Sequence, residues 1–191
     1  MSKAYDRIGA RLHDWLLAQP VFVVATAPGE GGHINASPKG MAGTFAILDE
    51  TTVAYLDYTG SGAETIAHLR DNGRITLMFM AFKGPPTIVR LQGTGRVVMH
   101  DEPEFAELRR LFSKPREIGQ RGIVIVTCDR IADSCGYAVP LMDYVGDRDL
   151  LDRSQERRDD AYYEKYWAER NATSIDGLPA LSERPVPHAS A

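Results

Sequence analysis

Six β-rich runs, joined mostly by short connections, constrain most strongly what this chain can fold into. They cover residues 21–26, 33–37, 51–57, 73–82, 87–99 and 121–131. Parallel strands need crossovers of a dozen or more residues, so most of these runs can pair only as antiparallel neighbours. Gly93 and Gly95 interrupt the fifth run, as at a bulge or a barrel corner. The pattern predicts an α+β fold built on a small, closed or split, six-stranded antiparallel barrel.

Helical spacing of apolar residues adds peripheral helices to this barrel. The first helix runs from about Tyr5 to Gln19 and stops at Pro20. Three more are expected over residues 62–71, where Asn72 and Gly73 form the C-cap, and over 103–112 and 147–171. A Pro-rich stretch follows. We therefore expect one domain, residues 1–172, and a C-terminal tail, residues 173–191, which packs at a dimer interface or is disordered at its end.

Composition excludes several classes of partner. The 191 residues are 43% hydrophobic and 25% charged, which suits a single globular domain. A net charge of −4 gives no electrostatic case for nucleic acid. No apolar run approaches the roughly 20 residues that cross a bilayer, and the N-terminus lacks the apolar core of a signal peptide. We expect a soluble, cytoplasmic protein without nucleic-acid or membrane partners.

The cysteines and histidines indicate neither a disulfide framework nor a metal site. Cys128 lies in an apolar strand pattern and Cys135 in the loop after it, at a spacing that matches no zinc motif. The five histidines are scattered along the chain. No Ser-His-Asp, Cys-His or paired-carboxylate arrangement can be assembled, which argues against a hydrolase.

A Thr/Gly/Ser turn at residues 59–62 joins a β-rich run to a helix. Such a turn presents backbone N–H groups and a helix N-terminus, which favour an anion such as phosphate. It is not a P-loop, because no Gly-Lys-Ser/Thr follows the glycines. Ser61 and Glu64 also have the spacing of a capping box, which would satisfy the helix donors without a ligand. The residues alone leave both interpretations open.

Six segments together resemble, in order and spacing, the pyridoxamine 5′-phosphate oxidase-related, FMN-binding split-barrel family. They span residues 34–40, 55–62, 64–70, 84–86 with Arg90 behind them, 134–140 and 174–179. The resemblance covers nearly the whole chain. It implies a six-stranded split barrel that forms a homodimer, with one FMN in each of two clefts at the subunit interface.

The resemblance also implies which residues bind the cofactor. The phosphate and ribityl chain would be held at the turn after the strand, by Thr59, Gly60, Ser61, Gly62 and Thr65, and Tyr58 would also contact the cofactor. The isoalloxazine would be lined by Ser37, Pro38 and Lys39, with Arg90 as a second cation and with Cys135 and Gly136 against the partner's flavin. The simpler interpretation makes Lys39 a solvated turn lysine, Arg90 a strand-edge charge and Cys135 a small packing residue.

Three positions, in two places along the chain, depart from the family's pattern. Gly62 and Ala63 stand where many members carry an Arg or Lys, and Ala46 stands where a basic residue is common. Phosphate binding would then depend on backbone donors and hydroxyls.

The function implied by the resemblance is that of an FMN-dependent oxidoreductase. Hydride or electrons would pass between a reduced donor and a small acceptor or oxygen, and no catalytic side chain is identified. The alternative is a non-catalytic redox sensor or stress protein that binds flavin, deazaflavin or haem. Oxidation of pyridoxamine 5′-phosphate itself would need an Arg-rich second phosphate site, and residues 182–185 supply one arginine.

Overall fold

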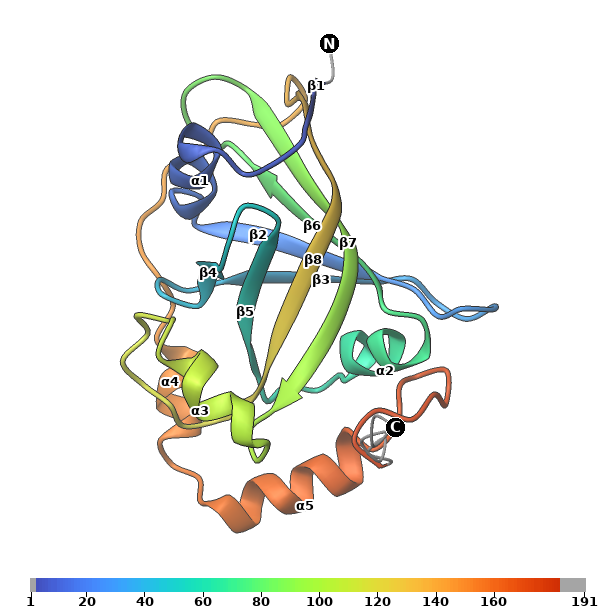
Figure 1. The fold of residues 1–191 in the computed structure, drawn as a ribbon. Helices are drawn as coiled ribbons and strands as arrows, with labels where there is room; N and C mark the ends of the chain where they lie inside the picture. Colours follow the sequence, from blue (N-terminus) through green and yellow to red (C-terminus); the bar gives the residue numbers. More distant parts are fainter. Residues whose placement is uncertain (1–2, 183–191) are drawn as a thin grey trace.

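The computed structural model describes residues 3–182, which form one curled antiparallel sheet flanked by helices (Figure 1). The strands are β1 Lys3–Tyr5, β2 Val21–Thr26, β3 Asn35–Gly40, β4 Phe45–Ile47, β5 Thr52–Tyr58, β6 Arg74–Met80, β7 Thr87–Met99 and β8 Gln120–Cys135. The helices are α1 Ala10–Leu17, α2 Glu64–Asp71, α3 Pro103–Arg109, α4 Leu150–Gln155 and α5 Asp160–Arg170. The predicted α+β class with an antiparallel split barrel is confirmed.

The sheet is open at one seam. Hydrogen-bonded neighbours follow the order β3-β2-β6-β7-β8-β5-β4, and β1 pairs with β8. The long strands β7 and β8 form the middle, with Thr87 opposite Cys135 at one end and Met99 opposite Gly122 at the other. Within the described residues no backbone ladder joins β3 to β4, so these two strands form the edges of the split.

Several element boundaries differ from the sequence predictions. Two short strands, β1 and β4, join the six predicted ones. The first helix begins at Ala10 instead of near Tyr5, because residues 3–5 pair with β8. The predicted helix 147–171 is two helices, because the Asp159 carboxylate accepts a hydrogen bond from Tyr162 N and starts a new one. Strand β8 continues to Cys135, which therefore ends a strand and does not lie in a loop.

The irregularity predicted at Gly93 is confirmed. The register of β7 on β8 shifts between Gln92 and Gly93. A side chain at Gly93 would overlap the carbonyl oxygen of Thr127, so only glycine allows the two backbones to approach this closely. A bulge at this point increases the bend of the strands, which helps to curl the sheet.

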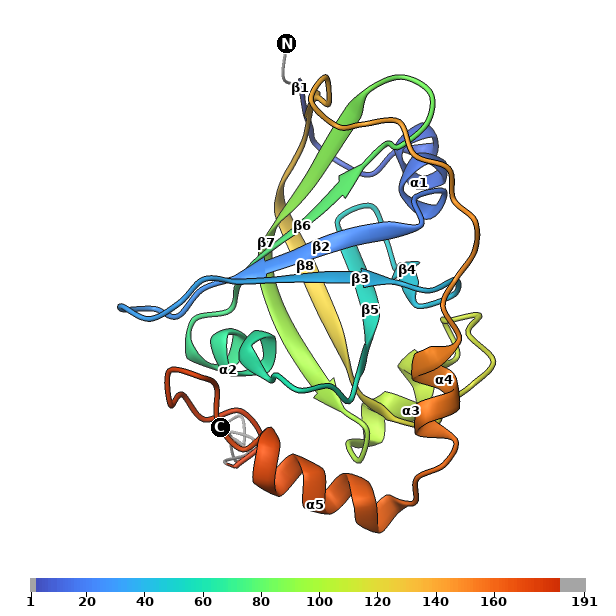
Figure 2. The same ribbon diagram turned by 180° about the vertical axis from the view of Figure 1, so that it is seen from behind.

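Aromatic rings fill the inside of the curl near the seam. Phe22 and Phe79 stack with their ring centroids 5.0 Å apart, and Phe45 and Tyr55 pack against Phe22 at 5.3 and 5.7 Å. Helices α2 to α5 gather at one end of the barrel, and α1 lies toward the other (Figures 1 and 2). The segment between β8 and α4 runs down the outside of the barrel to reach this helical end.

The C-terminal part of the described chain packs on its own α2. Leu178 and Ala180 contact Ala63 and Ala67, and Ala180 is fully buried. This contact places residues 173–182 against the helix that follows the Thr/Gly/Ser turn. The remainder of the predicted tail, residues 183–191, lies outside the described residues, and the role of the tail at a dimer interface stays a prediction.

Candidate functional site

The turn between β5 and α2 is buried at its start and exposed at its tip. Thr59 is 6% exposed and its N–H donates to the carbonyl of Gly119 at 2.8 Å, whereas Gly60 and Ser61 are exposed. The capping box proposed for Ser61 is wrong. Ala63 is the N-cap residue of α2, and no side chain caps the helix, because the chain becomes helical two residues later than the sequence suggests.

Side chains from the C-terminal helices hold this turn from behind. Gln155 donates its amide Nε2 to the carbonyl of Thr59 at 3.2 Å, and Trp167 donates its Nε1 to Thr59 Oγ1 at 2.9 Å. Asn171, the C-cap residue of α5, donates its Nδ2 to the carbonyl of Gly60 at 3.1 Å. These contacts hold the carbonyls of Thr59 and Gly60 and the hydroxyl of Thr59 in place. The backbone conformation of the turn is therefore stabilised by residues about a hundred positions later in the chain.

The tip of α2 carries a carboxylate. A methyl group added at Gly62 would overlap Glu64 Oε2, and Glu64 Oε1 accepts a hydrogen bond from Ile175 N at 3.3 Å. An anion placed directly at the helix tip would meet this negative charge, which disfavours it. The phosphate role of the turn stays a prediction, and its exposed part, Gly60 and Ser61, is the part that a ligand can reach.

A buried charge cluster lies beside the turn. Asp57 and Arg121 are 1% and 3% exposed, and Arg121 donates to Asp57 Oδ2 through Nε and Nη2, both at 2.8 Å. Lys39 Nζ lies 3.3 Å from Asp57 Oδ1. Burial would raise the pKa of Asp57, but the charges of Arg121 and Lys39 outweigh burial and hold the pKa below its usual value.

The pair between Lys39 and Asp57 spans the seam of the barrel. Lys39 is on β3, at one edge of the sheet, and Asp57 is on β5, next to the other edge strand. A side-chain ion pair therefore links two regions that no backbone ladder joins. The Lys39 side chain keeps about a quarter of its surface exposed, 26%, so its charge also reaches the adjoining cleft.

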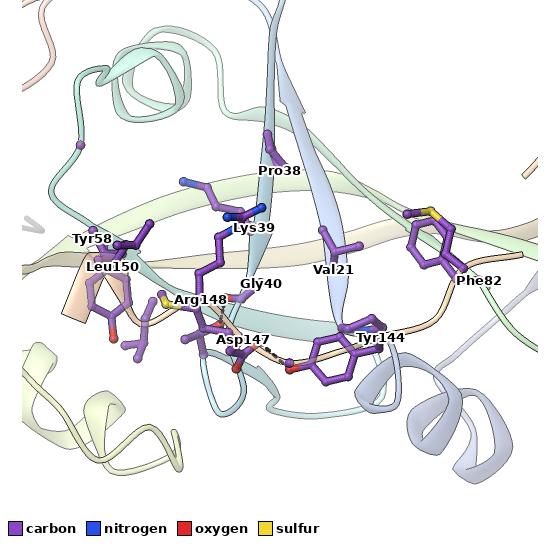
Figure 3. Close-up of a pocket in the computed structure, with 18 of the residues that line it drawn as sticks. Val21, Pro38, Lys39, Gly40, Tyr58, Phe82, Tyr144, Asp147, Arg148 and Leu150 are labelled. Atoms are coloured by element: carbon purple, nitrogen blue, oxygen red, sulfur yellow. Dashed lines mark hydrogen bonds between the residues drawn. The ribbon is translucent and has the colours of Figure 1, made fainter. Parts of the chain in front are cut away.

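A cleft of about 710 Å³ opens over this seam (Figure 3). One wall is formed by the ends of β2, β3 and β5 and by the turn, with Val21, Pro38, Lys39, Tyr58, Thr59 and Gly60. The opposite wall is the segment that leads into α4, with Met142, Tyr144, Asp147 and Arg148. We call the first the inner wall and residues 141–149 the outer wall.

Few hydrogen bonds attach the outer wall to the barrel. Met142 N donates to the carbonyl of Phe82 at 3.1 Å, and Asp147 Oδ2 accepts from Ala42 N at 2.8 Å. Tyr144 donates its hydroxyl to Asp147 Oδ1 at 2.7 Å. Arg148 has no hydrogen-bond or ion-pair partner among the described residues, and its side chain extends toward β3, where Lys39 lies (Figure 3). The cleft thus receives one cation from each wall.

The structure brings most of the predicted cofactor residues to one region. Pro38, Lys39, Tyr58, Thr59 and Gly60 line the cleft, and Ser61 and Gly62 follow directly in the turn.

Ser37 and Thr65 lie in a polar chain just inside the barrel. Ser37 Oγ donates to Asn35 Oδ1, and Asn35 Nδ2 donates to Thr65 Oγ1, each at 3.1 Å. They do not line the cleft in the described chain, and their contact with a cofactor stays a prediction.

Arg90, Cys135 and Gly136 lie elsewhere. Arg90 donates to Ser134 Oγ at 3.0 Å, and Cys135 is paired with Thr87 at the far end of β7 and β8. None of the three lines the cleft in the described chain, although Cys135 pairs with Thr87, whose carbonyl accepts a hydrogen bond from Ala81 N, beside the lining residue Phe82.

The outer wall and the residues that hold the turn were not predicted from the sequence. Residues 141–149 have no periodicity, and the contacts of Gln155, Trp167 and Asn171 are long-range. One feature of the sequence could have indicated the outer wall: it directly follows residues 134–140, one of the six segments that resemble the family.

Among residues 3–182, no group of three or more His, Cys, Asp or Glu side chains could hold a metal ion. In the same part of the chain, no helix has the length and apolar character needed to cross a membrane.

Solved structures resemble this fold. A tagged variant of HupZ from Group A Streptococcus is 21% identical, with a TM-score of 0.54, and covers 66% of this chain and 99% of its own. The FAD binding protein from Mycobacterium smegmatis is 18% identical, with a TM-score of 0.46, and covers 68% of this chain and 97% of its own. At 21% identity, the likeness to the HupZ variant concerns the fold alone.

Sequence relatives identify the family. The family model described as pyridoxamine 5′-phosphate oxidase matches residues 8–135. The pyridoxamine 5′-phosphate oxidase family protein ustO of Aspergillus flavus is 39% identical over 194 residues, which cover 93% of this chain and 77% of that protein. The match spans most of both proteins and includes the strands and turn that form the cleft. This chain belongs to the pyridoxamine 5′-phosphate oxidase family.

Proposed function

We propose that this protein is an FMN-dependent oxidoreductase that holds the flavin in the cleft between the inner and outer walls. It would pass hydride or electrons between a reduced donor and a small acceptor or oxygen. The observation that carries the proposal is the cluster of Lys39, Asp57 and Arg121, whose net charge is +1 and whose exposed member faces the cleft.

The cleft suits a flavin in size and chemistry. Its volume, about 710 Å³, falls within the range of about 300–1,000 Å³ found for small-molecule and cofactor sites. Pro38, Leu56, Tyr58 and Met142 supply apolar surface for a ring system. Lys39 and Arg148 supply positive charge for the anionic groups.

The residues divide into distinct roles under this proposal. Bound FMN would supply hydride acceptance and donation, which no side chain of the chain provides. Lys39 and Arg148 would bind and orient the cofactor's anionic groups, with the exposed backbone N–H groups of Gly60 and Ser61 beside them. Met142 and Tyr144 of the outer wall would exclude water from the ring. Asp57 and Arg121 would hold Lys39 in place.

We further propose that the protein acts as a homodimer. Arg90, Cys135 and Gly136 do not line the cleft of their own chain, and the family resemblance implies that Cys135 and Gly136 lie against the flavin of a second copy. Apolar side chains around the outer wall support an interface: Tyr137, Leu141 and Val145 are 84%, 81% and 99% exposed in the single chain.

The first experiment is an absorption spectrum of the purified protein, with any released cofactor identified by mass. We expect the flavin spectrum and the mass of FMN. Anaerobic addition of reduced nicotinamide should then bleach the flavin band within seconds. Bound flavin that no common donor reduces would favour a redox sensor, and a protein that neither retains nor rebinds flavin would contradict the proposal.

A pair of lysine variants locates the cofactor. Lys39→Met should raise the Kd for FMN by about tenfold, since one charge contact of this kind contributes about 1.5–3 kcal/mol. Lys165→Met is the control, because Lys165 lies on the exposed face of α5 with only a long pair to Glu169 at 3.9 Å. Equal affinities in the two variants would place the flavin away from Lys39.

A further inference from the structure

Asn171 makes two buried hydrogen bonds that connect the end of α5 to the cleft. The residue is fully buried. Its Nδ2 donates to the carbonyl of Gly60 at 3.1 Å, and its Oδ1 accepts from Arg121 Nη1 at 2.8 Å. One amide thus holds both the turn at the inner wall and the arginine of the buried charge cluster.

The contacts continue from Arg121 to the cleft. Arg121 donates to Asp57 at 2.8 Å, and Asp57 accepts from Lys39 Nζ at 3.3 Å. The Nη1 of Arg121 also donates to the carbonyl of Gly62 at 3.1 Å. The position of Lys39 therefore depends, through Asp57 and Arg121, on the amide at the end of α5.

The chemistry of an amide matters at this position. Two cations and one carboxylate leave the cluster with a charge of +1, and a neutral acceptor for Arg121 preserves that excess. An aspartate of the same shape would offer Arg121 a second carboxylate and reduce the net charge to zero. It would also replace the donor to the Gly60 carbonyl with an acceptor, so the turn would lose its support.

We propose that Asn171 is a positioning residue of the cofactor cleft, which keeps the buried cluster positive and fixes the turn so that the site selects a flavin carrying phosphate over one without it. This inference rests on the proposed function. It assigns a role in cofactor selection to a residue that lies outside the matched family region, residues 8–135.

The chain contains a matched control. Asn72 has the same pair of contacts in another place: its Nδ2 donates to the carbonyl of Ala27 at 2.9 Å, and its Oδ1 accepts from Arg74 Nε at 3.2 Å. Asn72 is the C-cap residue of α2 and does not line the cleft. Asn72→Asp therefore applies the same amide-to-carboxylate change to a half-buried asparagine that also contacts a backbone carbonyl and an arginine, away from the site.

The test is a titration of wild type, Asn171→Asp and Asn72→Asp with FMN and with riboflavin, which lacks the phosphate. We expect Asn171→Asp to raise the Kd for FMN by about tenfold or more, because the added carboxylate cancels the cluster's net positive charge and removes the donor to the Gly60 carbonyl. The Kd for riboflavin should change by less than about threefold, and Asn72→Asp should leave both values unchanged. Circular dichroism and a thermal melt check that each variant is folded.

Each outcome decides the inference. Equal losses for FMN and riboflavin would make Asn171 merely structural, and unchanged FMN affinity would overturn its role while leaving the proposed function intact. A wild type that binds neither compound would overturn the proposed function and this inference together. If Asn171→Asp does not fold, Asn171→Ala replaces it. That variant keeps the cluster's charge but removes the donor to Gly60, and it should still weaken FMN more than riboflavin.

Discussion

The two walls of the cleft are built in opposite ways. The inner wall is supported by Thr59, which lines it, and by Asp57 and Arg121 behind it; all three are nearly fully buried and have hydrogen-bond partners within the chain. At the outer wall, the large apolar side chains Leu141, Met142, Tyr144 and Val145 are all at least half exposed. The inner wall is fixed by buried polar contacts, and the outer wall is attached through its backbone and a few carboxylate oxygens.

The difference between the two walls explains how one cleft can recognise a specific ligand and still open to let it enter. Buried polar groups that all have partners specify a single geometry, which suits recognition of a charged cofactor. A segment with few buried contacts can separate from the barrel at a free-energy cost well below that of global unfolding. We expect the outer wall to open while the inner wall keeps its shape, and four variants test this contrast.

The largest expected effect is the loss of the buried ion pair. Arg121→Met leaves Asp57 buried with only the 3.3 Å contact to Lys39, and breaking such a pair typically costs about 3–5 kcal/mol. The midpoint of urea unfolding should fall accordingly. Arg153→Met is the control, because Arg153 and Asp149 form an exposed pair at i,i+4 on α4, worth less than about 0.5 kcal/mol. Similar midpoints for the two variants would remove the contrast between buried and exposed charge.

A smaller effect is expected from the hydrogen bond that ties α5 to the turn. Trp167→Phe removes the Nε1 donor to Thr59 Oγ1 and keeps a ring against His100, whose centroid lies 4.6 Å away. We expect a loss of about 1 kcal/mol in the free energy of unfolding. Trp15→Phe, at a half-buried tryptophan whose Nε1 has no partner among the described residues, should cost less. The reverse order would mean that α5 does not stabilise the turn.

His68, on α2, is expected to make the free energy of unfolding depend on pH. It is fully buried, with Nδ1 3.0 Å from Thr26 Oγ1. Burial lowers the pKa of His68, against the raising influence of Glu64 and Asp176. Below about pH 6.5 the unfolded chain therefore binds a proton that the folded chain does not, and stability falls as the pH falls.

The check on His68 is a comparison of melting temperatures. Wild type should lose more stability than His68→Gln between pH 7.5 and pH 5.5, because glutamine does not titrate. Parallel curves for the two proteins would show that His68 is not held neutral by burial.

The smallest effect on global stability is expected at the outer wall. Asp147→Ala removes the acceptor for Ala42 N and for the Tyr144 hydroxyl, both near the surface. Global unfolding should change by less than about 1 kcal/mol, whereas hydrogen exchange at Ala42 should become faster. A large global loss would show that the outer wall is as integral to the fold as the inner wall.

The barrel could be predicted from the sequence because its strands are specified locally. Short connections force antiparallel pairing, Gly93 marks the bulge, and Asn72 with Gly73 closes α2 with a φ of 73° at the glycine. The break between α4 and α5 is also local, at Asp159, but the polar run around it reads as one charged helix. Strand β1 depends on pairing with β8, which no local pattern shows.

The site could be predicted only in part, for a related reason. Lys39 and the turn follow recognisable motifs, whereas Arg148 reaches the cleft through an irregular segment that has no periodicity. Glu64 was assigned to a capping box, but the tertiary contact with Ile175 N directs its carboxylate to the tip of the helix. Long-range contacts of this kind are set by packing and leave no signal in a single sequence.

Hydrogen–deuterium exchange with and without FMN tests the central claim most directly. If flavin binds between the two walls, backbone amides of residues 141–149 should exchange several-fold more slowly with FMN, while the inner strands, already protected, should change little. Bound FMN that leaves residues 141–149 unaffected and protects another surface would contradict the account.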